Sequence, residues 1–222
     1  FTTTPDITKL KEGIYDSPMV FLTIKDDISL DDNNNTYFKD VSDEKPTHIT
    51  LNEGKSLTGT KDGQVAIKAG VSVTSKGTIK LTGKNTVALF AKRSNYNWSS
   101  TSSIEIGEDS IGQYTIYDVN SDRDWNENHG TITLGKKSTG IRIDRNYNNT
   151  NGYAINTSTG KILSTAEKVT GMVAYTTDAD GSGYFRIENR GEINLSGDRS
   201  TGMYTAGKGE TEMCNNKKII MG

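Results

Sequence analysis

Aromatic side chains set among polar residues are the part of this sequence best suited to bind a ligand. Tyr96, Trp98, Trp125 and Tyr147 stand among Asn, Asp, Ser and Arg residues. An aromatic face can stack on the C–H surface of a sugar ring, while amide, carboxylate and guanidinium groups hydrogen-bond the hydroxyls. We therefore predict ligand binding, to a sugar or a protein, at these four aromatic residues, with Asp122 and Asp124 as their polar partners.

The segments that carry the aromatic residues also have a purely structural interpretation. Tyr184-Phe-Arg-Ile187 and Tyr153-Ala-Ile155 have the alternation of strands, in which aromatic residues would pack against a core. Tyr96, Trp98 and Trp125 have the least strand-like neighbours, which favours surface positions for them. Both interpretations stay open at this stage.

Acid–base chemistry has one dense candidate, Asp122-Arg-Asp124. Enzymes that cleave polysaccharides need two or three carboxylates, or an Asp with a basic partner, projecting from neighbouring segments. The sequence contains no Gly-x-Ser-x-Gly, phosphate-loop or zinc motif. We predict that the protein is not an enzyme and keep a polysaccharide-cleaving enzyme as the alternative.

Metal binding has only weak support, and we expect no cofactor. Asp178-Ala-Asp180-Gly resembles the first half of a calcium loop, but Glu188 falls one place too early to close it and flanking helices are missing. The sequence leaves calcium binding at Asp178 and Asp180 open. Cys214 is the single cysteine, which excludes internal disulfides and multi-cysteine metal sites.

Charge and hydropathy exclude two classes of partner. The 26 basic and 28 acidic residues leave a net charge of −2, which argues against nucleic acid held by phosphate contacts. No stretch approaches the roughly 18 apolar residues of a membrane-spanning helix, so we expect no membrane-embedded segment. We also expect a monomer.

The elements that must position these residues come from an internal repeat of 25–31 residues. Isoleucine begins an Ile-x-Leu or related motif in each copy, and a second apolar motif follows eight or nine residues later in all but the first. The isoleucines are Ile49, Ile79, Ile104, Ile132, Ile162 and Ile193. In the first copy the second motif lies 14 residues after Ile49.

Stacking of these copies predicts the fold. Alternation puts both side chains of Ile-x-Leu on one face of a strand, and a single unit cannot bury them alone. Gly, Ser and Asn would turn the chain before the second strand, since corners often need positive φ. We predict an all-β parallel β-helix (β-solenoid) of about six coils, with polar insertions leaving one corner. The insertions are Ala91–Ser103, Tyr117–His129, Asp144–Thr159 and Thr176–Arg190.

The repeat also divides the chain. Residues 1–46 are irregular and are predicted to form early coils or a cap, and residues 47–222 are the β-helical region. Lys217-Lys-Ile219-Ile resembles the start of another copy, which predicts a fragment of a longer array.

One copy of the repeat resembles the repeats of large autotransporter passenger domains, most closely those of fusobacterial outer-membrane adhesins. This copy is Gly191-Glu-Ile193-Asn-Leu195-Ser-Gly197-Asp-Arg-Ser200-Thr-Gly202-Met-Tyr204. The resemblance implies a secreted passenger on the outer membrane of a Gram-negative cell. It implies adhesion to a host-cell glycan or surface receptor, or to a partner bacterium, and a part in virulence. A stalk that binds nothing is a further alternative.

Overall fold

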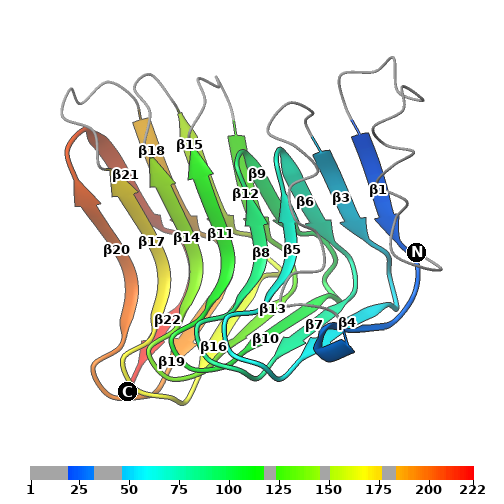
Figure 1. Cartoon of the computed structure of the whole chain (residues 1–222). Coiled ribbons are helices and arrows are strands. Elements are labelled where there is room, and N and C mark those ends of the chain that lie inside the picture. Colours follow the sequence, from blue (N-terminus) through cyan, green and yellow to red (C-terminus); the bar gives the residue numbers. More distant parts are fainter. Residues whose placement is uncertain (1–19, 33–46, 118–123, 146–150, 177–183) are drawn as a thin grey trace.

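The computed structural model describes residues 20–32, 47–117, 124–145, 151–176 and 184–222, whose strands form three parallel sheets (Figure 1). Sheet A contains β1 (Val20–Ile24), β3 (Thr47–Leu51), β6 (Ser72–Ser75), β9 (Ser94–Asn97), β12 (Asp124–Asn128), β15 (Gly152–Asn156), β18 (Tyr184–Asn189) and β21 (Glu210–Asn215). Sheet B contains β2 (Ile28–Ser29), β4 (Ser56–Gly59), β7 (Thr78–Leu81), β10 (Ser103–Ile106), β13 (Thr131–Leu134), β16 (Lys161–Ser164), β19 (Glu192–Leu195) and β22 (Ile219–Met221). Sheet C contains β5 (Val65–Ala69), β8 (Val87–Ala91), β11 (Ile111–Tyr117), β14 (Thr139–Arg145), β17 (Thr170–Thr176) and β20 (Thr201–Gly207).

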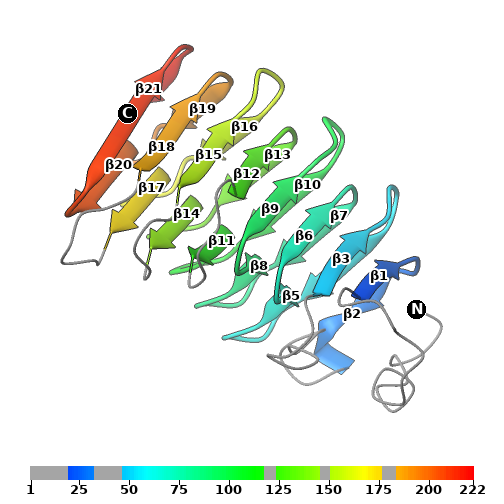
Figure 2. The same ribbon diagram turned by 90° about the horizontal axis from the view of Figure 1, so that it is seen from above.

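The chain visits sheets A, B and C in the same order in every coil. Within the described residues, six coils from β3-β4-β5 to β18-β19-β20 have all three strands. Seen from above, the coils follow one another along a single axis in sequence order (Figure 2). A single turn of 3₁₀ helix, Leu30–Asp32, follows β2. The predicted parallel β-solenoid of about six coils is confirmed.

The predicted isoleucine column forms the inner face of sheet B. Neighbouring strands place Ile79 beside Ile104, Ile104 beside Ile132, and so on through Ile162 and Ile193. Each of these side chains is at most 1% exposed. Burial of such aliphatic side chains contributes about 1.5–3 kcal/mol each, so the column is a main source of stability.

Ile49 does not belong to that column, and its assignment from the sequence is wrong. It lies in sheet A opposite Val73, while Leu57 occupies the column position beside Ile79. Val65 then follows Leu57 by eight residues, as Val87 follows Ile79, so the irregular spacing disappears. The error arose because Ile-Thr-Leu alternates in the same way on any half-buried strand, and alternation does not identify the sheet.

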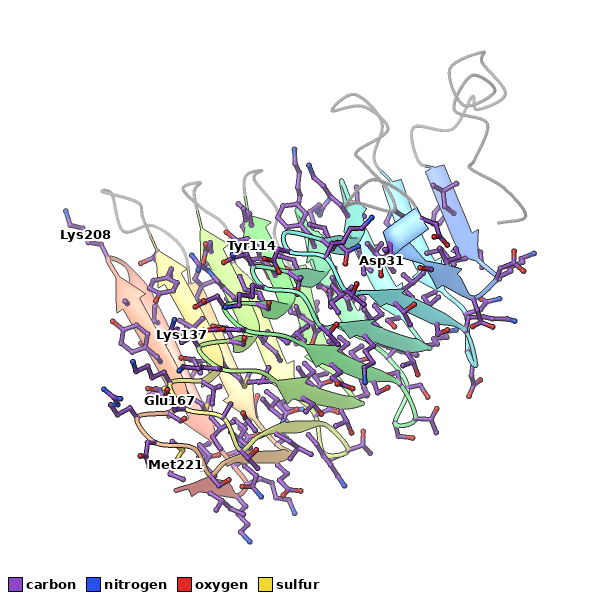
Figure 3. All side chains as sticks on the ribbon, turned by 60° about the horizontal axis from the view of Figure 1, so that its bottom comes forward. Asp31, Tyr114, Lys137, Glu167, Lys208 and Met221 are labelled. Carbon is purple, nitrogen blue, oxygen red and sulfur yellow. The ribbon has the colours of Figure 1, made fainter. Side chains whose placement is uncertain are left out.

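The turn from sheet B to sheet C has one residue with positive φ in each complete coil. The six are Gly63, Asn85, Asp109, Lys137, Lys168 and Arg199, with φ from 53° to 74°. Stacked coils also bond through this corner, where the Lys137 amide donates to the Glu167 carbonyl (3.1 Å; Figure 3).

Gly107, just before this turn, is needed for space rather than for its backbone angle. A Cβ on Gly107 would lie 2.2 Å from the carbonyl oxygen of Gly83 in the preceding coil. The sequence correctly marked the corner, but in five of these six coils a non-glycine residue takes the left-handed conformation.

The four polar insertions each contribute a strand to sheet A. β9, β12, β15 and β18 lie within them, so the structural interpretation of these segments is correct as far as strands are concerned. Residues 118–123, 146–150 and 177–183, which belong to three of the insertions, lie outside the described residues.

A ladder of asparagine side chains runs along the inner edge of sheet A, and the sequence analysis missed it. The last residue of each of five successive strands is an asparagine, and Nδ2 of each of the first four donates to Oδ1 of the asparagine in the next coil. The four bonds measure 2.7–2.9 Å and join Asn97, Asn128, Asn156, Asn189 and Asn215. The first four of these residues are fully buried.

The ladder ties each coil to the next inside the turn from sheet A to sheet B. Asn128 Nδ2 also donates to the Lys161 carbonyl, and Asn156 Nδ2 to the Glu192 carbonyl. A buried amide without partners would cost free energy, so each of these five coils supplies an asparagine at the same place. The ladder thereby sets the register in which sheet A strands pair.

Replacing Asn156 by alanine should destabilise the protein by about 2–3 kcal/mol, because two ladder bonds disappear and the amide groups of Asn128 and Asn189 each lose a partner. Urea unfolding followed by circular dichroism measures the loss. The control is Asn194→Ala on the outer face of sheet B, which should change the free energy of unfolding by less than about 0.5 kcal/mol. Equal effects of the two substitutions would contradict the role of the ladder.

Candidate ligand-binding groove

The outer face of sheet A carries the aromatic residues singled out from the sequence. Side chains alternate along a strand, so when Asn95 and Asn97 of β9 point inward, Tyr96 and Trp98 point outward. The same alternation in β12 turns Asn126 inward and Trp125 outward.

These aromatic rings form two contacting groups. Tyr96 and Trp98 meet edge to face, with ring centroids 5.4 Å apart and planes at 86°. Trp125 stacks on Tyr153 of β15, with centroids 4.6 Å apart and planes at 17°. Because Tyr153 covers one face of Trp125, the opposite face is directed towards β9, where the same row holds the small residue Ser94.

A groove of about 540 Å³ opens beside these rings. The described residues that line it are Thr50, Thr74, Lys76, Tyr96, Trp98, Trp125 and Glu127. Its shape follows from the register of sheet A, which places Thr50, Thr74, Tyr96 and Glu127 in one outward row. Short threonines on β3 and β6 stand beside large rings on β9 and β12, and the step between them is the groove.

The polar groups of the groove lie at its two sides. Glu127 Oε2 lies 2.7 Å from Nε2 of His129, and the His129 ring in turn contacts Trp98 at 4.9 Å between centroids. Lys76 lies two strands away, beyond Tyr96 and Trp98. Trp98 is 46% exposed, so the aromatic wall remains open to a ligand.

Three of the predicted binding residues are therefore neighbours in space. Their location differs from the prediction in one respect, because Tyr96 and Trp125 lie in strands and Trp98 directly follows one. Ser-Asn-Tyr-Asn and Asp-Trp-Asn-Glu-Asn have little intrinsic strand preference, and pairing with neighbouring coils and the asparagine ladder hold them extended. Asp122 and Tyr147 lie outside the described residues, and of Asp124 only the place at the start of β12 is described.

Sequence reasoning missed four residues of the groove, namely Thr50, Thr74, Lys76 and Glu127. Each of these residues is of a common polar type and belongs to no recognisable binding motif. The signal that could have found them is the sheet register, since Thr50 and Thr74 stand in the row of Tyr96 once β3, β6 and β9 are paired.

Sheet C also presents aromatic residues, but their polar groups are already paired. Arg142 lies between the rings of Tyr114 and Tyr175, at 5.2 and 4.9 Å from their centroids, and its Nη2 donates to Asp144 (2.8 Å). The Tyr114 hydroxyl donates to the same carboxylate, and burial together with Asp144 raises the pKa of Tyr114 to about 12. This cluster therefore offers a ligand fewer unpaired polar groups than the groove on sheet A does (Figure 3 labels Tyr114).

Comparison with known proteins agrees with a surface role. A family model described as the BigA fourth domain matches residues 18–222. The chain belongs to the BigA fourth-domain family. No curated protein and no solved structure matches it. Membership in the BigA family supports a surface adhesin-like protein and suggests a non-enzymatic one, whereas the likeness to fusobacterial adhesins remains a resemblance of the repeats.

Among the described side chains of the BigA-family domain, Glu188 of β18 is a nearly buried carboxylate on the outer face of sheet A. Arg190 donates to it through Nε (2.7 Å) and Nη2 (2.9 Å), Arg186 lies at 3.1 Å, and Asn216 Nδ2 donates at 2.6 Å. The hydrogen bond from Arg190 is the main cause that lowers the pKa of Glu188. Glu188 is thus held by cations in a strand, which removes it from any calcium loop; Asp178 and Asp180 lie outside the described residues.

The described part of the BigA-family domain has neither a metal-binding cluster nor a membrane-spanning helix. Among the described residues, no group of three or more His, Cys, Asp or Glu side chains has an arrangement that could hold a metal ion. No helix in the described part of the chain is long and apolar enough to cross a membrane.

Replacing Glu188 by glutamine should destabilise the BigA-family domain at neutral pH by about 1–3 kcal/mol, because charge-assisted bonds from Arg190 and Arg186 are lost. The pKa of Glu188 is lower in the folded state, so this stabilisation is complete above the ordinary pKa of a glutamate and disappears as the pH falls through the lowered value. The stability difference between the two proteins should therefore close below about pH 4.

Urea unfolding of both proteins between pH 3 and 8 checks this, with Glu105→Gln, at the exposed pair with Lys80, as the control. Glu105→Gln should lower the free energy of unfolding by less than about 0.5 kcal/mol at every pH. A Glu188→Gln difference that is independent of pH would contradict the account.

Proposed function

We propose that this domain is a section of a bacterial surface adhesin that binds carbohydrate on host cells or on partner bacteria through the groove on sheet A. The β-solenoid acts as a stalk that holds the groove away from the cell. We further propose that the chain is displayed as a passenger on the outer membrane of a Gram-negative cell and functions there as a monomer.

The gathering of Tyr96, Trp98 and Trp125 around one open groove is the observation that carries this proposal. Aromatic rings with a free face bind the apolar side of a pyranose, and threonine hydroxyls, an amine and a carboxylate are suited to its hydroxyl groups. A groove of about 540 Å³ falls within the range of sites for small ligands. Mounting these residues on strands rather than on loops gives the site a rigid support.

Catalysis is the weaker alternative. Within the described part of the groove, Glu127 is the one carboxylate, and it is paired with His129. Cleavage of a glycosidic bond needs a second carboxylate on the other side of the bond. This arrangement supports binding without turnover.

A stalk that binds nothing is the second candidate, and the regular ladders favour it. The isoleucine column and the asparagine ladder continue through successive coils, as in a spacer whose purpose is length. The two candidates differ in what they require of the exposed aromatic residues, since a pure spacer has no need of Trp98.

Replacing Trp98 by alanine should weaken binding to a glycan array, and to cells that bear the glycans recognised, by at least about tenfold, because the stacking surface is removed. Trp125→Ala should act in the same direction. The control is Tyr204→Ala on sheet C, whose side chain is 45% exposed against 46% for Trp98, and it should leave binding unchanged.

Circular dichroism and urea unfolding establish that each variant is folded. Binding by folded Trp98→Ala and Trp125→Ala proteins at the level of the unaltered domain would remove the groove from the account. Absence of all binding by the unaltered domain would favour the non-binding stalk.

A further inference from the structure

We propose that the groove on sheet A recognises an acidic pyranose, a hexuronic or sialic acid, whose carboxylate pairs with Lys76. This inference rests on the proposed function and names the class of sugar that the site selects. It comes from the balance of charge in the groove and from the distance between its charged groups.

The two charged residues that line the groove, Glu127 and Lys76, differ in whether a neighbouring side chain contacts their charged group. Glu127 Oε2 has a hydrogen-bond partner in Nε2 of His129, 2.7 Å away. Lys76 lines the same groove, and among the described residues no carboxylate lies within ion-pairing distance of its ammonium group. Among the described lining residues, Lys76 is thus a cation without a carboxylate partner, and it can pair with an anionic group of a ligand.

The two charged residues are far enough apart for an acidic sugar to avoid repulsion. Lys76 follows β6 and Glu127 lies in β12, with β9 between them, so their strands are separated by about 10 Å at a strand spacing of roughly 4.8 Å. A single pyranose with its substituents bridges such a gap. Its carboxylate would lie at Lys76 and its hydroxyl groups at Glu127, whose oxygens accept hydrogen bonds.

The aromatic wall fixes the orientation of the ring between these ends. Trp98 and Lys76 directly follow the paired residues Asn97 and Ser75, and Tyr96 is paired with Thr74. A sugar whose apolar face lies on these rings directs its ring substituents across the strands, towards Lys76 after β6 on one side and Glu127 of β12 on the other. The hydroxyls of Thr50 and Thr74 lie at the base of the groove, within the same lining.

The test compares methyl β-D-glucuronide with methyl β-D-glucoside, which differ only in the carboxylate at C6. Ligand-observed NMR titration of the whole domain should give an affinity about three- to fivefold higher for the glucuronide, as expected of a partly exposed ion pair. The preference should shrink when the salt concentration is raised. N-acetylneuraminic acid is a separate arm, which distinguishes a sialic from a uronic acid source.

Lys76→Met should abolish the preference for the glucuronide, because the ammonium group that pairs with the carboxylate is removed while the methionine retains the aliphatic part of the side chain. Lys68→Met on sheet C is the matched control and should preserve the preference. Trp98→Ala should weaken both sugars together.

Each contrary outcome has a distinct meaning. Equal affinity for the two glycosides, or a preference that survives Lys76→Met, would overturn the acidic-sugar inference and leave the proposed carbohydrate groove in place. Failure of every sugar to bind at millimolar concentration, together with cell binding that depends on Trp98, would overturn the inference in favour of a protein ligand. Cell binding unaffected by Trp98→Ala would overturn the proposed function itself.

Discussion

Parallel, in-register stacking of equivalent residues is the constraint on which this molecule depends. Every coil must offer its neighbour an aliphatic side chain in sheet B and, along five coils, an asparagine at the end of sheet A. The aliphatic column and the asparagine ladder differ in how strictly they constrain the geometry of the coils. Aliphatic contacts tolerate changes of shape, whereas an amide ladder needs its donor and acceptor within hydrogen-bond distance and so sets the register of the strands. Close approach of the coils at the glycine corner follows from the same spacing.

The same register explains why a groove exists on the outer face. Because Asn95, Asn97 and the residues stacked on them fill the inward positions of sheet A, its outward positions are free to vary from coil to coil. Thr50 and Thr74 are small and Tyr96 is large, so a step forms where one coil succeeds the other. A solenoid can thus acquire a binding site through changes in a few outward residues, because the geometry of its inner ladders does not depend on them. This separation suits the surface adhesin-like role of the BigA family.

Much of the architecture was accessible from the repeat. The spacing of Ile79, Ile104, Ile132, Ile162 and Ile193 predicted the inner column of sheet B, and the insertions predicted the side of the coil that varies. Ile49 was misplaced because a short alternating segment fits any sheet equally well. Tyr96, Trp98 and Trp125 were recognised by residue type, but their strands were not, since Asn-rich segments have little strand propensity and become extended through contacts with other coils.

The composition and periodicity of the chain alone decided that it would be a parallel solenoid with aromatic residues set among polar ones, because periodic burial of apolar side chains is a property of the one-dimensional pattern. Only the tertiary structure decided which of those aromatic residues meet. Tyr96 and Trp125 are 29 positions apart in the sequence and become neighbours because β9 and β12 pair in sheet A. The asparagine ladder and the lining of the groove have the same origin, since a contact between coils depends on register, which is a relation between segments and not a property of any one of them.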